Sequence, residues 1–184
     1  MSWKNTDVRY GSVSIGFHWL MFFLLVAVYS CIELRELYPK GSDPREAFKA
    51  WHFMLGLTVF ALVCLRLGFR LTQVTPAIEP ALGNRQQLVA KIVQLLLYVL
   101  MIGMPLGGWL ILSGEGKPIP FYGLELPPLM AENEDAAEFI EDIHKLIGKI
   151  GYFLIALHTL AALFHHYIQK DNTLMRMLPR GKGK

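Results

Sequence analysis

HKLIGKIGYFLIALHTLAALFH, residues 144–165, combines a membrane-length apolar run with histidines at a helical interval. The 20 residues 150–169 contain no Asp, Glu, Lys or Arg, and about 20 apolar residues let a helix cross a bilayer. One stripe of that helix, at a spacing of seven residues, carries His144, Gly151, His158 and His165. An ionisable side chain inside a membrane is costly and usually serves a function. The segment therefore predicts a spanning helix that turns histidines toward the interior of a bundle.

Three further segments have the composition of spanning helices. Uncharged runs of 23 residues cover 10–32 and 92–114, and a run of 16 covers 50–65, where the apolar pattern continues to Arg70. The whole chain is 53% hydrophobic, above the share of about 45–50% usual in soluble domains. We therefore expect an all-α protein, an integral membrane four-helix bundle that forms a single domain over residues 1–184. Its helices should cover about 12–37, 47–70, 86–113 and 138–169.

Charge predicts the orientation of the bundle. Residues 1–9, 66–91 and 170–184 carry 11 Lys/Arg and 3 acids, whereas residues 33–49 and 115–149 carry 7 Lys/Arg and 12 acids. Because Lys and Arg concentrate on the cytoplasmic side, we expect a multi-pass protein of the bacterial inner membrane with both termini cytoplasmic. Its surroundings are then membrane lipid, and we expect no nucleic-acid partner. The prolines between 118 and 128 predict an irregular loop before an acidic helical lead-in at 132–142.

Four histidines are expected at two matched depths in this bundle. His18 lies about 7–8 Å inside the cytoplasmic end of the first helix, and His158 lies about 21 Å along the fourth helix from His144. Depth therefore pairs His18 with His158 and, near the opposite face, His52 with His144. Paired neutral imidazoles on facing helices suit the two axial bonds of a b-type haem iron. Glycines near these positions should let a flat macrocycle approach the backbone, namely Gly56, Gly148 and Gly151.

Other roles remain open for these residues. A membrane histidine can be a hydrogen-bonded packing or proton-path residue, and glycines can serve close helix packing. A zinc site would need further Cys, Asp or Glu donors. The absence of Cys-x-x-Cys-His excludes covalent c-type haem, so the haem would be held without covalent attachment. Its propionates could meet Arg9, Arg66 and Arg70 inside, or Arg45, Lys49, Lys145 and Lys149 outside, although such cations can equally be interfacial anchors.

Several motifs together resemble the prokaryotic cytochrome b561 family. They are Arg9-Tyr10, His18-Trp19, His52-x₃-Gly56 with Arg66 and Arg70, Leu97-Tyr98, Pro105-Leu106-Gly107-Gly108-Trp109, Leu157-His158, His165-His166-Tyr167 and the ending from Lys170-Asp171-Asn172 to Pro179. The resemblance implies a four-helix bundle with two haem b groups, held by His18, His52, His144 and His158. Its best-understood members are superoxide oxidases, which pass electrons from superoxide outside to ubiquinone. Many members have a histidine where this chain has Gln94, and this departure concerns the quinone pocket or a proton path more than the haems.

We therefore expect an oxidoreductase, superoxide:ubiquinone oxidoreductase. The alternative is a cytochrome b subunit that serves a protein electron donor, as in hydrogenase or dehydrogenase modules, and a haem-free membrane adaptor is a third possibility. As catalytic candidates we expect Lys145 and Lys149 to guide superoxide to the outer haem, helped by Arg45, Lys49 and Lys117. His165 is the candidate proton source for a ubiquinone bound near the cytoplasmic haem.

Overall fold

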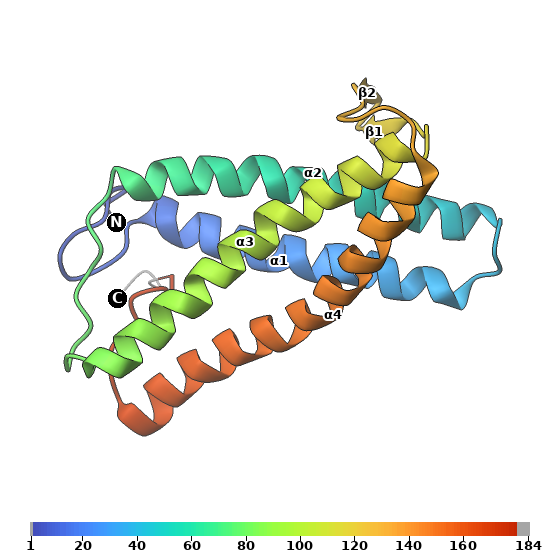
Figure 1. Ribbon diagram of the computed structural model, residues 1–184. Helices are drawn as coiled ribbons and strands as arrows, with labels where there is room; N and C mark the ends of the chain where they lie inside the picture. The colour runs from blue at the N-terminus through green and yellow to red at the C-terminus, as the bar shows by residue number, and fades with distance from the viewer. Residues whose placement is uncertain (1, 180–184) are drawn as a thin grey trace.

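Four long helices form the body of the molecule, a computed structural model that describes residues 2–179. They are α1 Ser12–Leu34, α2 Asp43–Leu71, α3 Asn84–Gly114 and α4 Glu134–Phe164 (Figure 1). All four are long and apolar enough to cross a membrane. The predicted helical bundle is therefore confirmed in its main elements.

Helix α2 begins four residues earlier than predicted, whereas α4 begins at Glu134, within the helical lead-in expected at 132–142. Ser42 precedes α2, and Pro44 occupies its first turn, where a missing N–H costs nothing. At α4 the side chain of Asn133 accepts the N–H of Ala136, and Glu134 and Asp135 follow in the first turn. A 3₁₀ turn Arg35–Leu37 extends α1, and a π turn His165–Gln169 extends α4. These turns end at the limits 37 and 169 that the sequence predicted.

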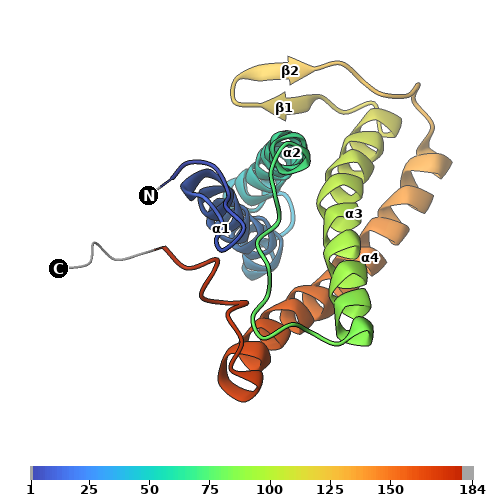
Figure 2. The same ribbon diagram turned by 90° about the vertical axis from the view of Figure 1, so that its left-hand side faces the viewer.

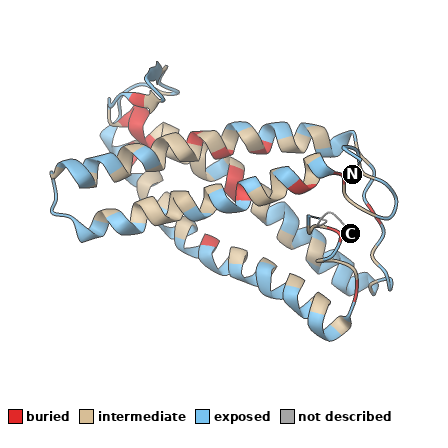
Figure 3. Cartoon of the chain, turned by 180° about the vertical axis from the view of Figure 1, so that it is seen from behind, coloured by how far each residue is buried: buried red, intermediate tan, exposed pale blue. Residues whose placement is uncertain are grey.

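The backbones pack in sequence order, α1 on α2, α2 on α3 and α3 on α4 (Figures 1 and 2). Within residues 2–179, α4 makes no comparable backbone contact with α1 or α2. The buried core therefore lies among the first three helices, around Met21, Val59, Val63 and Met101. Figure 3 shows that most of the helical surface is only partly buried or exposed. Large apolar side chains such as Phe23 and Phe153 point outward, as lipid-facing residues do.

One small β-hairpin is the part of the loop between α3 and α4 that departs from the predicted irregular structure, in a molecule that is otherwise helical. Strands β1 Ile119–Phe121 and β2 Leu124–Leu126 pair antiparallel (Figure 2). The turn residues Tyr122 and Gly123 both have positive φ, 50° and 85°, which suits a tight two-residue hairpin. Prolines are tolerated here because a two-stranded sheet consists only of edge strands. Ile119 is buried against Leu57 and Leu112, so the hairpin covers the end of α3 and the middle of α2.

A C-terminal strap, residues 170–179, closes the opposite end of the bundle. The Arg9 guanidinium donates to the carbonyl of Leu178 at 2.6 Å, and the Trp19 indole donates to the carbonyl of Met177 at 2.9 Å. The Arg176 guanidinium donates to the carbonyls of Pro76 and Ala77 in the α2–α3 connection. The first residues of the chain and the strap therefore lie at the same end (Figure 1). That this end faces the cytoplasm stays a prediction.

Candidate functional site

Two pairs of histidines face each other between α4 and the first two helices. His18 of α1 and His158 of α4 have ring centroids 6.2 Å apart, and His52 of α2 and His144 of α4 have ring centroids 6.4 Å apart. Two imidazoles on opposite sides of one metal ion have centroids about 6 Å apart, because each metal–nitrogen bond is about 2.0 Å and each centroid lies about 1 Å beyond its nitrogen. Each pair therefore has the spacing needed to hold one metal ion axially. The structure brings together the pairs that helix depth predicted.

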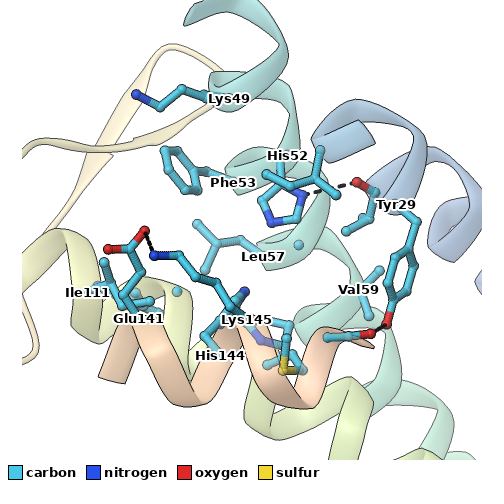
Figure 4. Close-up of a pocket in the computed structure, with 18 of the residues that line it drawn as sticks. Tyr29, Lys49, His52, Phe53, Leu57, Val59, Ile111, Glu141, His144 and Lys145 are labelled. Atoms are coloured by element: carbon cyan, nitrogen blue, oxygen red, sulfur yellow. Dashed lines mark hydrogen bonds and ion pairs between the residues drawn. The ribbon is translucent and has the colours of Figure 1, made fainter. Parts of the chain in front are cut away.

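The rings of the outer pair, His52 and His144, contact the protein on the side that faces away from the other ring. The Nδ1 atom of His52 lies 3.0 Å from the carbonyl oxygen of Val28 (Figure 4). A metal-binding histidine commonly donates its other N–H in this way, which fixes the ring and leaves Nε2 for the metal. The His144 ring lies against α3, where Cβ atoms at Gly107 and Gly108 would stand 3.4 and 3.6 Å from it. Its buried Nδ1 has no hydrogen-bond partner among the described residues.

An outer cavity of about 430 Å³ lies between these two rings. His52, His144, Gly56, Gly148, Lys145 and Lys149 are among its lining residues. A Cβ at Gly56 would meet nothing within 4 Å, so this glycine leaves open space beside His52. Because α4 stands away from the backbones of α1 and α2, the cavity can take a flat group between the helices. Figure 4 shows His52 and His144 on opposite sides of this space.

Gly151 does not provide the approach to a macrocycle that its spacing suggested. A Cβ at this position would collide with the hydroxyl of Tyr29 and would press on Leu100. That hydroxyl donates to the carbonyl of Gly148 at 3.0 Å, and the Tyr29 ring lies 4.3 Å from the ring of Tyr152. The Tyr152 hydroxyl in turn donates to Glu33 at 2.7 Å. Gly151 therefore serves close helix packing, which is the alternative role that the sequence left open for it.

We call Tyr29, Tyr152 and Glu33 the tyrosine clasp, because they join α1 to α4 beside the outer cavity. Sequence reasoning missed all three residues. The available signal was a tyrosine in each of two spanning helices and an acid at the end of one of them, which is too common a pattern to single out.

Most of the basic residues expected near the outer cavity are paired with acids. Lys145 lies 3.0 Å from Glu141 and 3.7 Å from Asp142. The same holds for three other pairs: Lys49–Glu46, Arg45–Glu36 and Lys117–Glu115. Among these five cations only Lys149 has no carboxylate within 4 Å in the described part of the chain. The predicted basic patch is therefore reduced to one unpaired cation that lines the cavity.

The basic residues at the inner end have more varied partners. Arg9 donates to the carbonyl of Leu178 in the strap, while its buried Nε has no partner among the described residues. Arg66 lies 3.5 Å from Nδ1 of His18, and Arg70 donates to Gln94 at 3.2 Å. Both guanidinium groups lie over the ring of Tyr98, at 5.7 and 5.5 Å from its centroid. Of the three predicted propionate ligands, Arg66 is the one seen to contact a histidine of the inner pair, and the role of Arg9 and Arg70 stays a prediction.

His165 has a partner that the sequence did not reveal. Its Nδ1 lies 2.5 Å from a carboxylate oxygen of Asp171, a side chain that is 1% exposed. Burial is the largest single influence on the pKa of Asp171 and raises it, but hydrogen bonds from Thr173 and His165 outweigh burial and bring this pKa below its ordinary value. Asp171 therefore stays charged and holds the His165 ring through Nδ1.

A multidentate metal site of the zinc type is absent from residues 2–179, where no group of three or more His, Cys, Asp or Glu is placed to hold a metal ion. The histidine pairs instead suit a metal whose remaining bonds come from a cofactor.

Comparison with known proteins agrees with this geometry. The family model described as prokaryotic cytochrome b561 matches residues 9–180. The chain belongs to the prokaryotic cytochrome b561 family. This cytochrome is 37% identical to cytochrome b561 homolog 1 of Escherichia coli, over 95% of its own length and 99% of the relative. It is 36% identical to a Yersinia pestis protein named probable superoxide oxidase CybB, over 95% and 98% of the two chains. Cytochrome b561 homolog 2 of Escherichia coli is 30% identical, over 100% and 98%.

Family membership confirms the coarser predictions about activity. The protein is a membrane cytochrome of the haem b type that transfers electrons, and it is an oxidoreductase. It is a multi-pass protein of the bacterial inner membrane.

Proposed function

We propose that this cytochrome is a superoxide oxidase with two haem b groups, one held by His18 and His158 and the other by His52 and His144. It would oxidise superoxide at the periplasmic side and reduce ubiquinone near the cytoplasmic side. The observation that carries the proposal is the presence of two facing histidine pairs, with centroids 6.2 and 6.4 Å apart, at opposite ends of one bundle. The name of the Yersinia pestis relative supports the choice of substrate.

The stoichiometry of this reaction is simple. Haem b, when bound, supplies one-electron chemistry. Two superoxide anions each lose one electron and become dioxygen, and one ubiquinone gains two electrons and two protons to become ubiquinol. The chain must therefore guide an anion at one end and deliver protons at the other.

At the outer end the residues exclude direct metal chemistry and attract the anion. His52 and His144 would hold the outer haem iron between their imidazoles, and superoxide would then transfer its electron without binding the metal. Lys149 lines the outer cavity without an acidic partner among the described residues, and it supplies the positive potential that concentrates a small anion there. Lys145 contributes less because Glu141 and Asp142 offset its charge.

At the inner end His165 is the proposed proton donor. Asp171 holds the ring through Nδ1, which leaves Nε2 to exchange a proton with a quinone oxygen. The Asp–His arrangement fixes both the orientation and the tautomer of the ring.

The deciding experiment uses the purified protein alone. We expect two haem b groups per chain, rapid reduction of both by superoxide, and reoxidation by a soluble ubiquinone. Full haem content without any reduction by superoxide would exclude the oxidase.

That result would favour the alternative function, a cytochrome subunit that receives electrons from a protein donor. One observation speaks for this alternative: the outer cations are mostly neutralised by acids, and the acidic start of α4 remains as a surface for a basic donor. Reduction of the haems by such a donor, and not by superoxide, would establish it.

A further inference from the structure

A small pocket lies between α1, the end of α2 and α3, at the end of the bundle that carries the strap. It encloses about 50 Å³, and its lining includes Arg66, Arg70, Tyr98 and Tyr10. Arg66 and Arg70 come from the last turns of α2, and Tyr98 comes from the facing turn of α3. We call Arg66, Arg70 and Tyr98 the guanidinium cradle. Arg66 also approaches Nδ1 of His18 to 3.5 Å, so the cradle adjoins the inner pair directly.

The two positive charges of the cradle lack a counter-ion. Among residues 2–179, no carboxylate lies within 4 Å of Arg66 or Arg70. Their neighbours are neutral: the face of Tyr98, the amide of Gln94 and the imidazole of His18. Charges within a spanning segment normally pair with an opposite charge, because the desolvation that they suffer is otherwise uncompensated. The two guanidinium charges of the cradle would therefore be stabilised by an anion that does not belong to the described part of the chain.

Hydrogen-bond donors in the cradle also lack an acceptor. The Tyr98 hydroxyl is buried without a partner in the described part of the protein. When a histidine binds a metal through Nε2, its Nδ1 carries a hydrogen, so His18 and Arg66 would present donors to the same space. A carboxylate accepts several hydrogen bonds at once and would satisfy these donors together with the charge.

We infer that the guanidinium cradle binds a propionate carboxylate of the haem held by His18 and His158, an inference that rests on the proposed function. The pocket has room for a carboxylate, since about 50 Å³ of space lies among these side chains. A lipid phosphate offers the same charge, and the experiment must distinguish the two anions.

The test compares holoproteins of the wild type, Arg66→Gln and Arg70→Gln by potentiometric titration of each haem. Arg85→Gln is the matched control, because Arg85 is an exposed arginine near the start of α3 at the same end of the bundle. Removal of a nearby cation favours ferric over ferrous iron. We therefore expect a lower midpoint potential only for the haem held by His18 and His158. The control should leave both potentials unchanged.

A second readout identifies the anion. Haem labelled isotopically at its propionate carboxyl carbons gives carboxylate bands in the redox-difference infrared spectrum. We expect Arg66→Gln and Tyr98→Phe to shift these bands and Arg85→Gln to leave them in place. The Tyr98→Phe variant removes only one hydroxyl, so it keeps the test valid if an arginine variant fails to fold.

Three results would overturn the assignment. Unshifted propionate bands with a changed potential would indicate a lipid phosphate in the cradle. Unchanged bands and potentials with a raised KM for quinone would place quinone there instead. Full haem content with no change in any measurement would leave the cradle without a ligand. Absence of haem from the wild type would refute the proposed function itself, which distinguishes the two failures.

Discussion

The Nδ1 atoms of three central histidines have different surroundings, although all four histidines have the same proposed role. His52 faces the carbonyl of Val28, His18 faces the cation Arg66, and His144 has no partner for its Nδ1 among the described residues. Such contacts set the orientation of an imidazole and its basicity as a ligand. The two sites should therefore differ in reduction potential even though both have two histidine ligands.

The first prediction concerns the pairing. His158→Ala should remove the haem proposed between His18 and His158 and keep the other, because each iron draws its axial ligands from one pair only. The haem-to-protein ratio should fall from two to one. His166→Ala, on the next turns of the same helix, is the control and should keep both haems. Retention of both haems in His158→Ala would disprove the pairing.

A second prediction concerns the anion. Lys149→Glu should slow haem reduction by superoxide about tenfold or more, whereas Lys145→Gln should have a smaller effect because two acids already offset Lys145. Rising salt should slow the wild type, since charges are screened over about 10 Å at 0.1 M. The rates come from stopped-flow absorbance at equal haem content. Salt-independent reduction with an unchanged rate in Lys149→Glu would contradict this role.

The third prediction concerns Asp171. Because its pKa is lowered in the folded protein, the charged carboxylate stabilises the fold at neutral pH, and this contribution is lost as pH falls through the folded pKa. Asp171→Asn should therefore lower stability by about 1–3 kcal/mol at neutral pH, and the difference from wild type should shrink below about pH 4. Thermal unfolding in detergent between neutral pH and pH 3 measures it. A constant difference over that range would argue against the ionised pair.

At the scale of the elements, hydropathy and helix depth located what matters most for the proposed site. The four spanning helices and the C-terminal limits of the first and fourth helices could be predicted from the length of the apolar runs. The two histidine pairs could be predicted from a rise of about 1.5 Å per residue along the helices. The start of α2 was placed too late because Asp43 and Glu46 lie in a helical turn beyond the apolar run, whereas the acidic start of α4 was expected to be helical. The hairpin was missed because its prolines obscured a strand signal.

Side-chain partners between elements were the least predictable part. The ion pairs of the outer cations were not anticipated, although Lys145 and Glu141 are four residues apart on one helix. The Asp171–His165 contact was not found because it depends on the π turn and on Lys170, whose φ is 57°. The tyrosine clasp depends on the spatial approach of α1 and α4, which no local pattern contains.

The fourth prediction tests the tyrosine clasp. Gly151→Ala should lower the thermal stability of the holoprotein because the new methyl group collides with the Tyr29 hydroxyl. Tyr29→Phe alone should cost about 1 kcal/mol for the lost hydrogen bond to Gly148. The double variant should be more stable than Gly151→Ala, since the colliding atom is gone. Gly103→Ala, where a Cβ meets nothing within 4 Å, is the control. Additive effects in the double variant would refute the collision.

At the scale of the whole molecule, the chain consists of two helical hairpins. The first, α1 and α2, provides His18 and His52, and the second, α3 and α4, provides His144 and His158. The hairpins pack directly through α2 and α3, whereas α4 faces the first hairpin across the two histidine pairs. Both proposed cofactors therefore join one hairpin to the other.

The fifth prediction follows from this arrangement. A variant without axial ligands from the first hairpin, His18→Ala/His52→Ala, should bind no haem and should be cut readily by protease in the connection between α2 and α3, residues 72–83. The holoprotein should resist cleavage there, because ligand binding stabilises the closed state. Limited proteolysis followed by mass spectrometry identifies the cut. Equal resistance of both proteins would show that the helices close without cofactor.

The separation between the backbone of α4 and the backbones of α1 and α2 also affects how the protein is made in the cell. A chain can insert both hairpins into the membrane before any haem arrives, but without haem α4 is joined to the first hairpin mainly through the tyrosine clasp. Newly inserted chains would then remain substrates for membrane proteases until they are loaded. We expect the amount of mature protein to follow haem supply rather than gene expression, so that bacteria starved of iron lose this oxidoreductase through turnover.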